Sequence, residues 1–159
     1  MPEPTDIARQ LIEDNNYMVL GTADPSGTPW VSPVYYTPDG YHDFYWVSSP
    51  DTRHSRNIAE RADVAITIFD SRVPIGTAEA VYLSAIAGRV PEDEIGATLA
   101  TYNGRLPEQK RIEPGEVLVS GLFRLYHAKA VEHSVLIRGG DPRYGRGADS
   151  RMTVELPVT

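Results

Sequence analysis

The spacing of apolar residues predicts a chain built mainly of β-strands. Apolar positions alternate or cluster over six stretches, and Gly, Pro, Asp or Asn turn signals separate neighbouring stretches. This pattern is typical of an antiparallel meander. The predicted strands cover 17–22, 30–36, 44–48, 64–69, 80–90 and 117–131, and a short last strand is predicted at 152–156.

Three helices are predicted between these strands. The first covers 5–14, where apolar residues recur on one helical face, and the second runs from the helix-start signal at 49–52 to about 62. A third helix opens at 91–94, where a proline precedes three acidic residues, and the following 103–116 read as a loop.

The strands and helices together predict a single domain over 1–159, with a Gly- and Arg-rich tail at about 138–159. Pro33 places its strand at a sheet edge or bulge, because proline lacks a ladder donor. Gly121 is expected to bend or bulge the longest strand. We expect a mainly β fold: a closed or nearly closed antiparallel barrel of six to seven strands, with short helices at its rim.

Composition narrows the class of protein. The 159 residues are 41% hydrophobic and 23% charged, which is ordinary for a globular domain, and there is no cysteine for a disulfide, a thiolate zinc site or a thiol nucleophile. No apolar run is long enough to span a membrane, and the polar N-terminus MPEPTDIARQ has no signal-peptide core. We therefore expect a cytoplasmic protein without a membrane partner.

The charge distribution indicates the kind of partner. The net charge of −7 disfavours nucleic acid. Basic residues are 13 arginines against only Lys110 and Lys129, and Arg138, Arg143, Arg146 and Arg151 crowd the last quarter. Arginine suits bidentate contact with phosphate or carboxylate. The alternative is a solvated surface tail.

Well-known catalytic motifs are missing from the sequence. It contains no dinucleotide-binding glycine fingerprint, no phosphate loop and no nucleophile elbow. His127 and His133, six residues apart, are expected to share a strand face. No third ligand lies nearby in the sequence, so no metal site is predicted.

The segment 46–57 is the most informative. A strand ends in Ser48 and Ser49, and a helix then begins with Thr52, Arg53, His54 and Ser55. The first turn of a helix offers free N–H groups and partial positive charge, so arginine and hydroxyl donors there make an anion site that suits phosphate. The alternative is that Asp51 or Thr52 only caps the helix while the arginines face solvent.

At these residues the chain resembles the pyridoxamine 5′-phosphate oxidase-like flavin-binding split barrels. The resemblance rests on an ordered series of motifs and covers about 5–131, with a weaker echo at 149–151. The motifs are Gly21-Thr22, Gly27 to Tyr36, Phe44 to Ser48, Thr52-Arg53-His54 and Ala62 to Ile66.

The resemblance implies a split β-barrel homodimer that holds FMN in each of two clefts at the subunit interface. Ser32, Pro33, Val34 and Tyr35 would lie along the flavin ring, and Val47 and Ser48 would contact the ring or the ribityl chain, with Ser49 following. Thr52, Arg53 and His54 would hold the phosphate. Ala80 and Arg151 fall where the family has a glutamine and a late arginine near the cofactor.

Three residues depart from the oxidase pattern. His54 replaces a lysine, Ser32 replaces an arginine, and Ala80 cannot make the glutamine's hydrogen bonds. These losses argue against oxidation of pyridoxamine phosphate itself and leave flavin binding expected.

The function expected from the sequence is an FMN-dependent oxidoreductase acting on an unidentified small molecule, with no catalytic residue assigned. The alternatives are an F420-dependent reductase and a non-catalytic protein that binds flavin, haem or another planar ligand. By strand alternation, Trp30, Ser32, Val34 and Tyr36 share one face, and one face of this strand should fill the barrel. The loops 70–80 and 103–116 are expected to form the substrate pocket.

Overall fold

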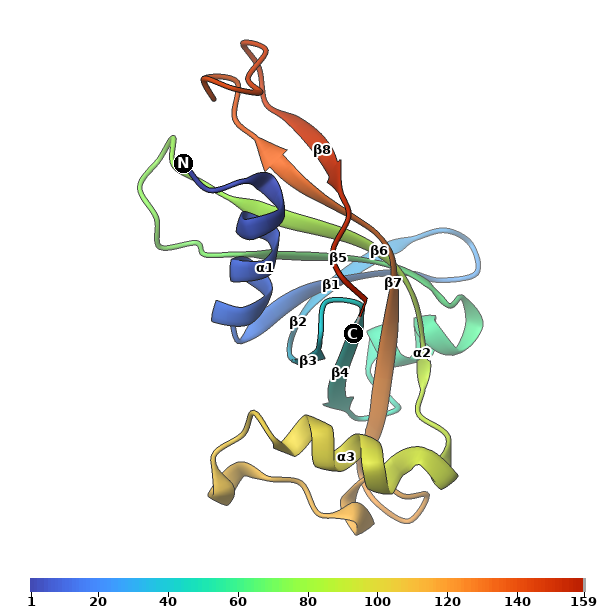
Figure 1. Cartoon of the computed structure of the whole chain (residues 1–159). Coiled ribbons are helices and arrows are strands. Elements are labelled where there is room, and N and C mark those ends of the chain that lie inside the picture. The colour runs from blue at the N-terminus through green and yellow to red at the C-terminus, as the bar shows by residue number, and fades with distance from the viewer. Residues whose placement is uncertain (159) are drawn as a thin grey trace.

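The computed structural model describes residues 1–158, so that Thr159, the last residue of the predicted domain, lies outside it. Three α-helices and eight strands follow one another along the chain (Figure 1). Their bounds are α1 Pro4–Asp14, β1 Tyr17–Ala23, β2 Pro29–Tyr35, β3 Thr37–Asp39, β4 Asp43–Ser48, α2 Arg53–Glu60, β5 Asp63–Phe69, β6 Ala80–Arg89, α3 Ile95–Asn103, β7 Arg124–Ile137 and β8 Ser150–Val154. Short 3-10 turns occur at Glu92–Glu94, Glu108–Lys110 and Pro114–Glu116.

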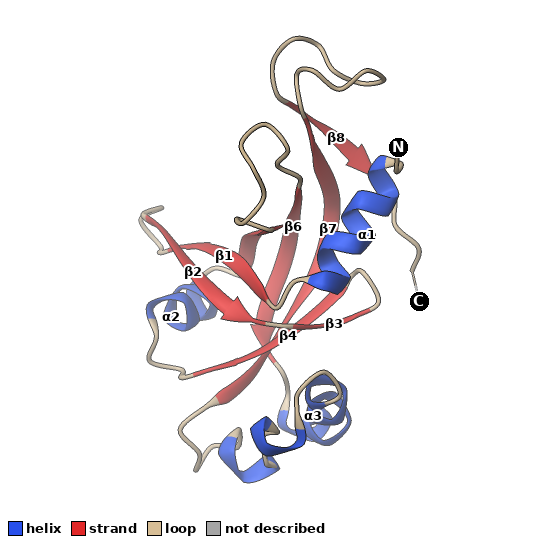
Figure 2. Ribbon diagram, turned by 90° about the vertical axis from the view of Figure 1, so that its left-hand side faces the viewer, coloured by secondary structure: helices blue, strands red, loops and turns tan. Residues whose placement is uncertain are grey.

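All strand pairs are antiparallel, and the sheet is strongly curled (Figure 2). The order is β2-β1-β5-β6-β7-β4-β3, and β8 pairs with β7 off this path. β2 and β3 end the path, so the barrel stays split there. The prediction of a mainly β split barrel with short peripheral helices is confirmed. Strand β3 was not predicted from the sequence, because Pro38, Asp39 and Gly40 are typical of a turn.

The main core fills the inside of the curl. Alternate residues of β1, β5 and β6 face inward, and Leu20, Ile66 and Leu83 are at most 3% exposed. Helix α1 adds Ala8 and Ile12, which are fully buried. Burial of such side chains stabilises the fold by about 1.5–3 kcal/mol each.

A second apolar cluster lies between α3 and the sheet, beside the first residues of β7. It contains Val90, Ile95, Leu99, Tyr102, Val117 and Leu125. The predicted strand 117–131 is wrong at its start, because residues 117–123 leave the sheet and β7 begins at Arg124. Val117 is drawn into this cluster, and the N–H of Gly121 donates to Leu118 O in a turn. Gly121 therefore lies in a loop rather than in a strand.

A β-bulge in β7 overturns the expectation that His127 and His133 share a face. Ser84 pairs with Glu132 and the next residue, Ala85, pairs with Ala130, so Val131 is an extra residue. One extra residue reverses which side chains point inward. His133 is accordingly 3% exposed inside the barrel, whereas His127 lies on the outer face.

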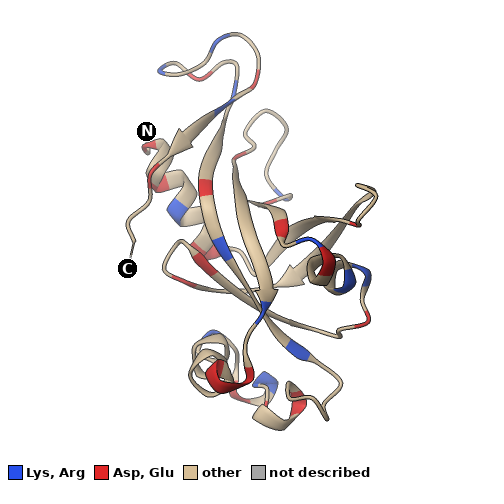
Figure 3. Cartoon of the chain, turned by 90° about the vertical axis from the view of Figure 1, so that its right-hand side faces the viewer, with Lys and Arg blue, Asp and Glu red and all other residues tan. Residues whose placement is uncertain are grey.

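The Arg-rich tail is partly tied to the rest of the domain. Arg143 pairs with Glu3 at 2.6 Å, and Arg138 donates to Ala78 O at 2.8 Å. Figure 3 shows basic residues on the loop between β7 and β8, at the opposite end of the molecule from α3. Within residues 1–158, no helix is long and apolar enough to cross a membrane.

Candidate functional site

Helix α2 begins with a side-chain cap and two free amide groups. Thr52 Oγ1 accepts the N–H of Ser55 at 3.2 Å, and Thr52 O accepts the N–H of Arg56 at 3.0 Å. No hydrogen-bond partner for the N–H groups of Arg53 and His54 occurs within residues 1–158. Capping by Thr52 and a free helix start therefore occur together, although the sequence presented them as alternatives.

Ser49 shapes the turn that leads into α2. The N–H of Asp51 donates to Ser49 Oγ at 3.2 Å, and Thr52 Oγ1 donates to Ser49 O at 3.0 Å. These bonds fix the direction in which the chain leaves β4. The start of α2 is therefore held in place on the side from which β4 arrives.

The imidazole of His54 lies between β2 and the end of β4 that β3 does not cover. Its Nδ1 is 3.2 Å from Ser32 Oγ on β2, and its Nε2 is 2.9 Å from Ser48 Oγ on β4. His54 is only 7% exposed, and burial lowers its pKa below the ordinary histidine value. The ring is therefore neutral at pH 7, and hydroxyl groups can serve it as both donor and acceptor.

Arg53 lies at the rim of this cluster. Its guanidinium carbon is 4.4 Å from the centroid of the Trp30 ring, a cation–π contact. Trp30 Nε1 in turn donates to Ser32 Oγ at 3.1 Å. Both Trp30 and Arg53 are exposed, so the cation is within reach of a ligand that approaches the start of α2.

The remaining predicted residues on β2 and β4 divide between the two faces of the sheet. Val34 is buried inside the barrel, whereas Pro33 is exposed on the outer face. Tyr35 and Val47 pack against the second cluster beside α3. Ser32 and Ser48 thus share a site with His54, and Val47 points to the opposite side from Ser48.

Ala80 and Arg151 lie far from α2 in the same chain. Helix α2 meets β6 near Gly88, and Ala80 is eight residues away at the other end of that strand, about 25 Å at the usual rise. Arg151 stacks over Tyr82, with its guanidinium carbon 4.2 Å from the ring centroid. A ligand at α2 does not reach either residue within one chain.

Asn57, which was not predicted from the sequence as a site residue, fastens α2 to the sheet. Its Nδ2 donates to Thr22 Oγ1 of β1 at 3.0 Å, and it is 6% exposed. The signal was available, because Asn57 follows His54 by three residues and shares its helix face.

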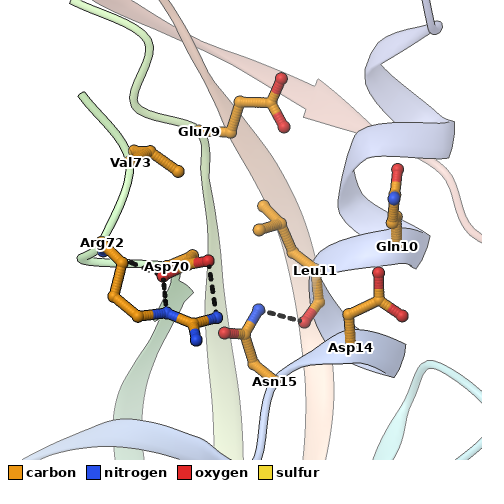
Figure 4. Close-up of a pocket in the computed structure, with 8 residues that line it drawn as sticks. All are labelled: Gln10, Leu11, Asp14, Asn15, Asp70, Arg72, Val73 and Glu79. Carbon is orange, nitrogen blue, oxygen red and sulfur yellow. Dashed lines mark hydrogen bonds and ion pairs between the residues drawn. The ribbon is translucent and has the colours of Figure 1, made fainter. Parts of the chain in front are cut away.

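A separate cavity of about 310 Å³ lies between α1 and the loop after β5 (Figure 4). Arg72 there is engaged by Asp70, with its Nε 2.9 Å from Asp70 Oδ1. Asp14 and Glu79 also line this cavity, so its charge does not suit a phosphate. The loop 70–80 expected to line a substrate pocket does line a cavity, but one distant from α2. In the part of the chain that the structure describes, no group of three His, Asp or Glu side chains could hold a metal ion.

Comparison with known proteins identifies the class of this fold. The family model described as "Pyridoxamine 5'-phosphate oxidase" matches residues 4–126, and the chain belongs to this family. No curated protein matches the chain. Solved structures with a similar fold are diverse, as three of them illustrate.

Each of these three solved structures is similar in fold to this chain, at 17–20% sequence identity. A haem-binding protein from Mycobacterium smegmatis is 20% identical with a TM-score of 0.68, and the match covers 96% of this chain and 59% of that one. The chain thus spans about three fifths of that protein's length. The haem storage protein HutZ from Vibrio cholerae is 17% identical with a TM-score of 0.69, covering 92% and 99%. A protein described as an F420 reductase is 20% identical with a TM-score of 0.59, covering 84% and 98%.

Proposed function

We propose that this protein binds FMN through its phosphate at the start of α2 and acts as a flavin-dependent oxidoreductase on a small molecule. The observation that carries the proposal is the pair of free amides on Arg53 and His54, next to the guanidinium of Arg53 at the rim of the split. Backbone N–H groups at a helix start, with an adjacent cation, are a common binding site for phosphate.

The residues at the start of α2 suit a phosphate group. Ser32, His54 and Ala80, in contrast, differ from the residues that contact the cofactor in the oxidase pattern. Arg53 supplies the charge, because neutral His54 already bonds to Ser32 and Ser48. His54 would then orient the two hydroxyl groups and keep the middle of β2 and the end of β4 at a fixed separation. Bound flavin would supply hydride or electron transfer, which no side chain provides alone.

We further propose that the protein is a homodimer in which the outer face of the sheet is covered by a second copy. Large apolar side chains are exposed there: Tyr17 is 62% exposed, Val31 65%, Ile86 47% and Val131 69%. Several large apolar side chains exposed on one face of a sheet are typical of an interaction surface. Ala80 and Arg151 would contribute to a flavin site only from the second copy, since they lie far from α2 in their own chain.

Specific residues support each of the two alternative functions, an F420-dependent reductase and a non-catalytic binding protein. Arg146 and Arg151 are exposed and make no ion pair within residues 1–158, although Arg151 stacks on Tyr82, so both guanidinium groups are available to the longer anionic tail of F420. Ala80 lacks a hydrogen-bonding side chain for a flavin ring, which favours binding of flavin, haem or another planar ligand without turnover.

The first experiment is a visible absorption spectrum of the purified protein, followed by separate titrations with FMN and F420. The proposal expects saturable FMN binding and reduction of the bound flavin by a nicotinamide donor. Tighter binding of F420 than of FMN would identify the deazaflavin as the cofactor in place of FMN. Binding without reduction by any donor would support the non-catalytic alternative, and a protein that binds neither cofactor contradicts the proposal.

A further inference from the structure

A cavity of about 480 Å³ lies outside the α2 site, between α3 and the outer face of β4, β7 and β6. Tyr45, Gly88 and His127 are neighbours across these three strands and line one side. Tyr45 and Ser48 lie on opposite faces of β4 by strand alternation, so this cavity is distinct from the cluster around His54.

His127 is held in one orientation by its neighbours. Its Nε2 lies 2.7 Å from Asp43 Oδ1, and its ring stacks on Tyr45 with centroids 5.0 Å apart at 27°. Lys129 also binds Asp43, at 3.0 Å. The two bonds outweigh the burial of the Asp43 carboxyl and lower its pKa, so it is ionised at pH 7. A carboxylate only accepts, so His127 Nε2 donates to Asp43 Oδ1 and the orientation of the ring is fixed.

Gly88 leaves space beside His127. A Cβ atom at Gly88 would meet no atom within 4 Å, and its backbone does not require glycine. The two stacked rings therefore border open volume rather than packed side chains. An aromatic ligand can add to such a stack, since offset ring pairs attract one another.

Charged groups of both signs line the same cavity. The Arg89 side chain has no hydrogen-bond or ion-pair partner among the described residues. Arg89 is the last residue of β6, and strand alternation directs its side chain to the face opposite Gly88, so it reaches this cavity around the end of the strand. Asp93 and Glu94 come from the turn before α3. An anionic ligand would meet the two carboxylates, and a cationic ligand would meet Arg89. A ligand with both charges satisfies the whole lining.

We propose that this cavity binds a small aromatic zwitterion, with its carboxylate on Arg89, its ammonium group near Asp93 and Glu94, and its ring beside Tyr45 and His127. The proposal does not depend on flavin binding, because Tyr45 and His127 lie on the opposite face of the sheet from Ser48 and His54.

The test follows the ring signals of His127 by NMR in histidine-labelled protein, with L-tryptophan as the probe. Tryptamine lacks the carboxylate and indole-3-propionate lacks the amine, so each serves as a matched control. We expect L-tryptophan to shift the His127 signals saturably and to bind about tenfold or more tightly than either control, the usual loss for a missing charged hydrogen bond. Equal binding of all three compounds, or no shift at millimolar L-tryptophan, would overturn the proposal.

A pair of glycine variants assigns the binding to this cavity. Gly88→Leu fills the open volume, whereas Gly96→Leu adds the same side chain at an exposed position of α3 where a Cβ also meets nothing. We expect Gly88→Leu to abolish the shift and Gly96→Leu to keep it, with both variants folded by circular dichroism. Persistent binding in folded Gly88→Leu places the ligand elsewhere and contradicts the proposal. None of these readouts involves FMN, so failure here leaves the α2 proposal unaffected.

Discussion

The imidazole of His54 joins Ser32 to Ser48 across the split in the barrel, with one ring nitrogen on each hydroxyl. No backbone ladder joins β2 to β4 within residues 1–158, so this side-chain bridge takes the place of strand pairing at that point. The same ring belongs to the first turn of α2. The position of the helix start and the width of the split are therefore coupled.

Arg53→Ala should weaken FMN binding about tenfold or more, because a charge-assisted bond to phosphate is lost. Arg56→Ala is the matched control, since Arg56 lies one turn nearer the helix interior and is exposed. Isothermal titration with FMN measures both. Release of Arg53 from Trp30 on binding should also change tryptophan fluorescence. Equal affinity in the two variants would show that α2 does not hold the phosphate.

The stability of the protein should fall as the pH drops below about 6.5. Burial lowers the pKa of both His54 and His133 in the folded state, so the unfolded chain takes up protons first. Each such histidine adds at most about 1.4 kcal/mol per pH unit to the slope of the unfolding free energy. Urea unfolding from pH 8 to pH 5.5, in the unmodified protein and in His54→Asn, measures this slope. An unchanged slope in the variant would count against a neutral His54.

Thr52→Ala should destabilise the protein by about 1 kcal/mol, the usual cost of losing a helix cap. Thr52→Ser keeps the oxygen that accepts the N–H of Ser55 and should stay close to the unmodified protein. Chemical unfolding of the two variants gives the difference. If both lose the same stability, the methyl group and not the cap is responsible.

Arg105→Ala should destabilise the protein by about 2–3 kcal/mol, because one guanidinium serves several backbone carbonyls. It donates to Tyr36 O at 2.9 Å, to Glu13 O at 3.1 Å and to Asn15 O. These bonds tie the loop after α3 to the end of α1. Arg111→Ala, an exposed position in the same loop, is the control for charge removal, and thermal unfolding compares the two.

Val31→Glu should convert the proposed dimer to a monomer, because it places a charge in the middle of the exposed apolar face of β2. Val158→Glu makes the same change at an exposed residue outside the sheet. Sedimentation velocity over a range of concentrations distinguishes the two. A Val31→Glu dimer as stable as the control would move the interface to another surface.

Local pattern was enough to predict most elements of the fold. β1, β5 and β6 combine alternating apolar residues with clear turn signals, and Thr52 precedes α2 as a cap should. The start of β7 was not predictable in this way. The apolar run from Val117 to Leu125 suits a strand, and only packing against α3 shows that its first part leaves the sheet.

The candidate site was predictable as a set of residue types but not as a geometry. The Thr-Arg-His sequence indicated an anion site, and Arg53 does lie at a free helix start. That His54 bridges Ser32 and Ser48 depends on how far apart β2 and β4 lie across the split, which no local pattern encodes. The pairing of Asp43 with His127 likewise depends on the register between β4 and β7.

The extra residue in β7 lets one strand belong to two environments. Before Val131 the odd-numbered side chains face outward and include His127, and after it the odd-numbered side chains face inward and include His133. If β7 kept Val131 but paired without the bulge, a single alternation would run through the whole strand. Either His133 would then leave the core, or His127 would turn inward and away from Asp43. The bulge therefore lets one strand keep a buried histidine and a histidine paired with a carboxylate on its outer face.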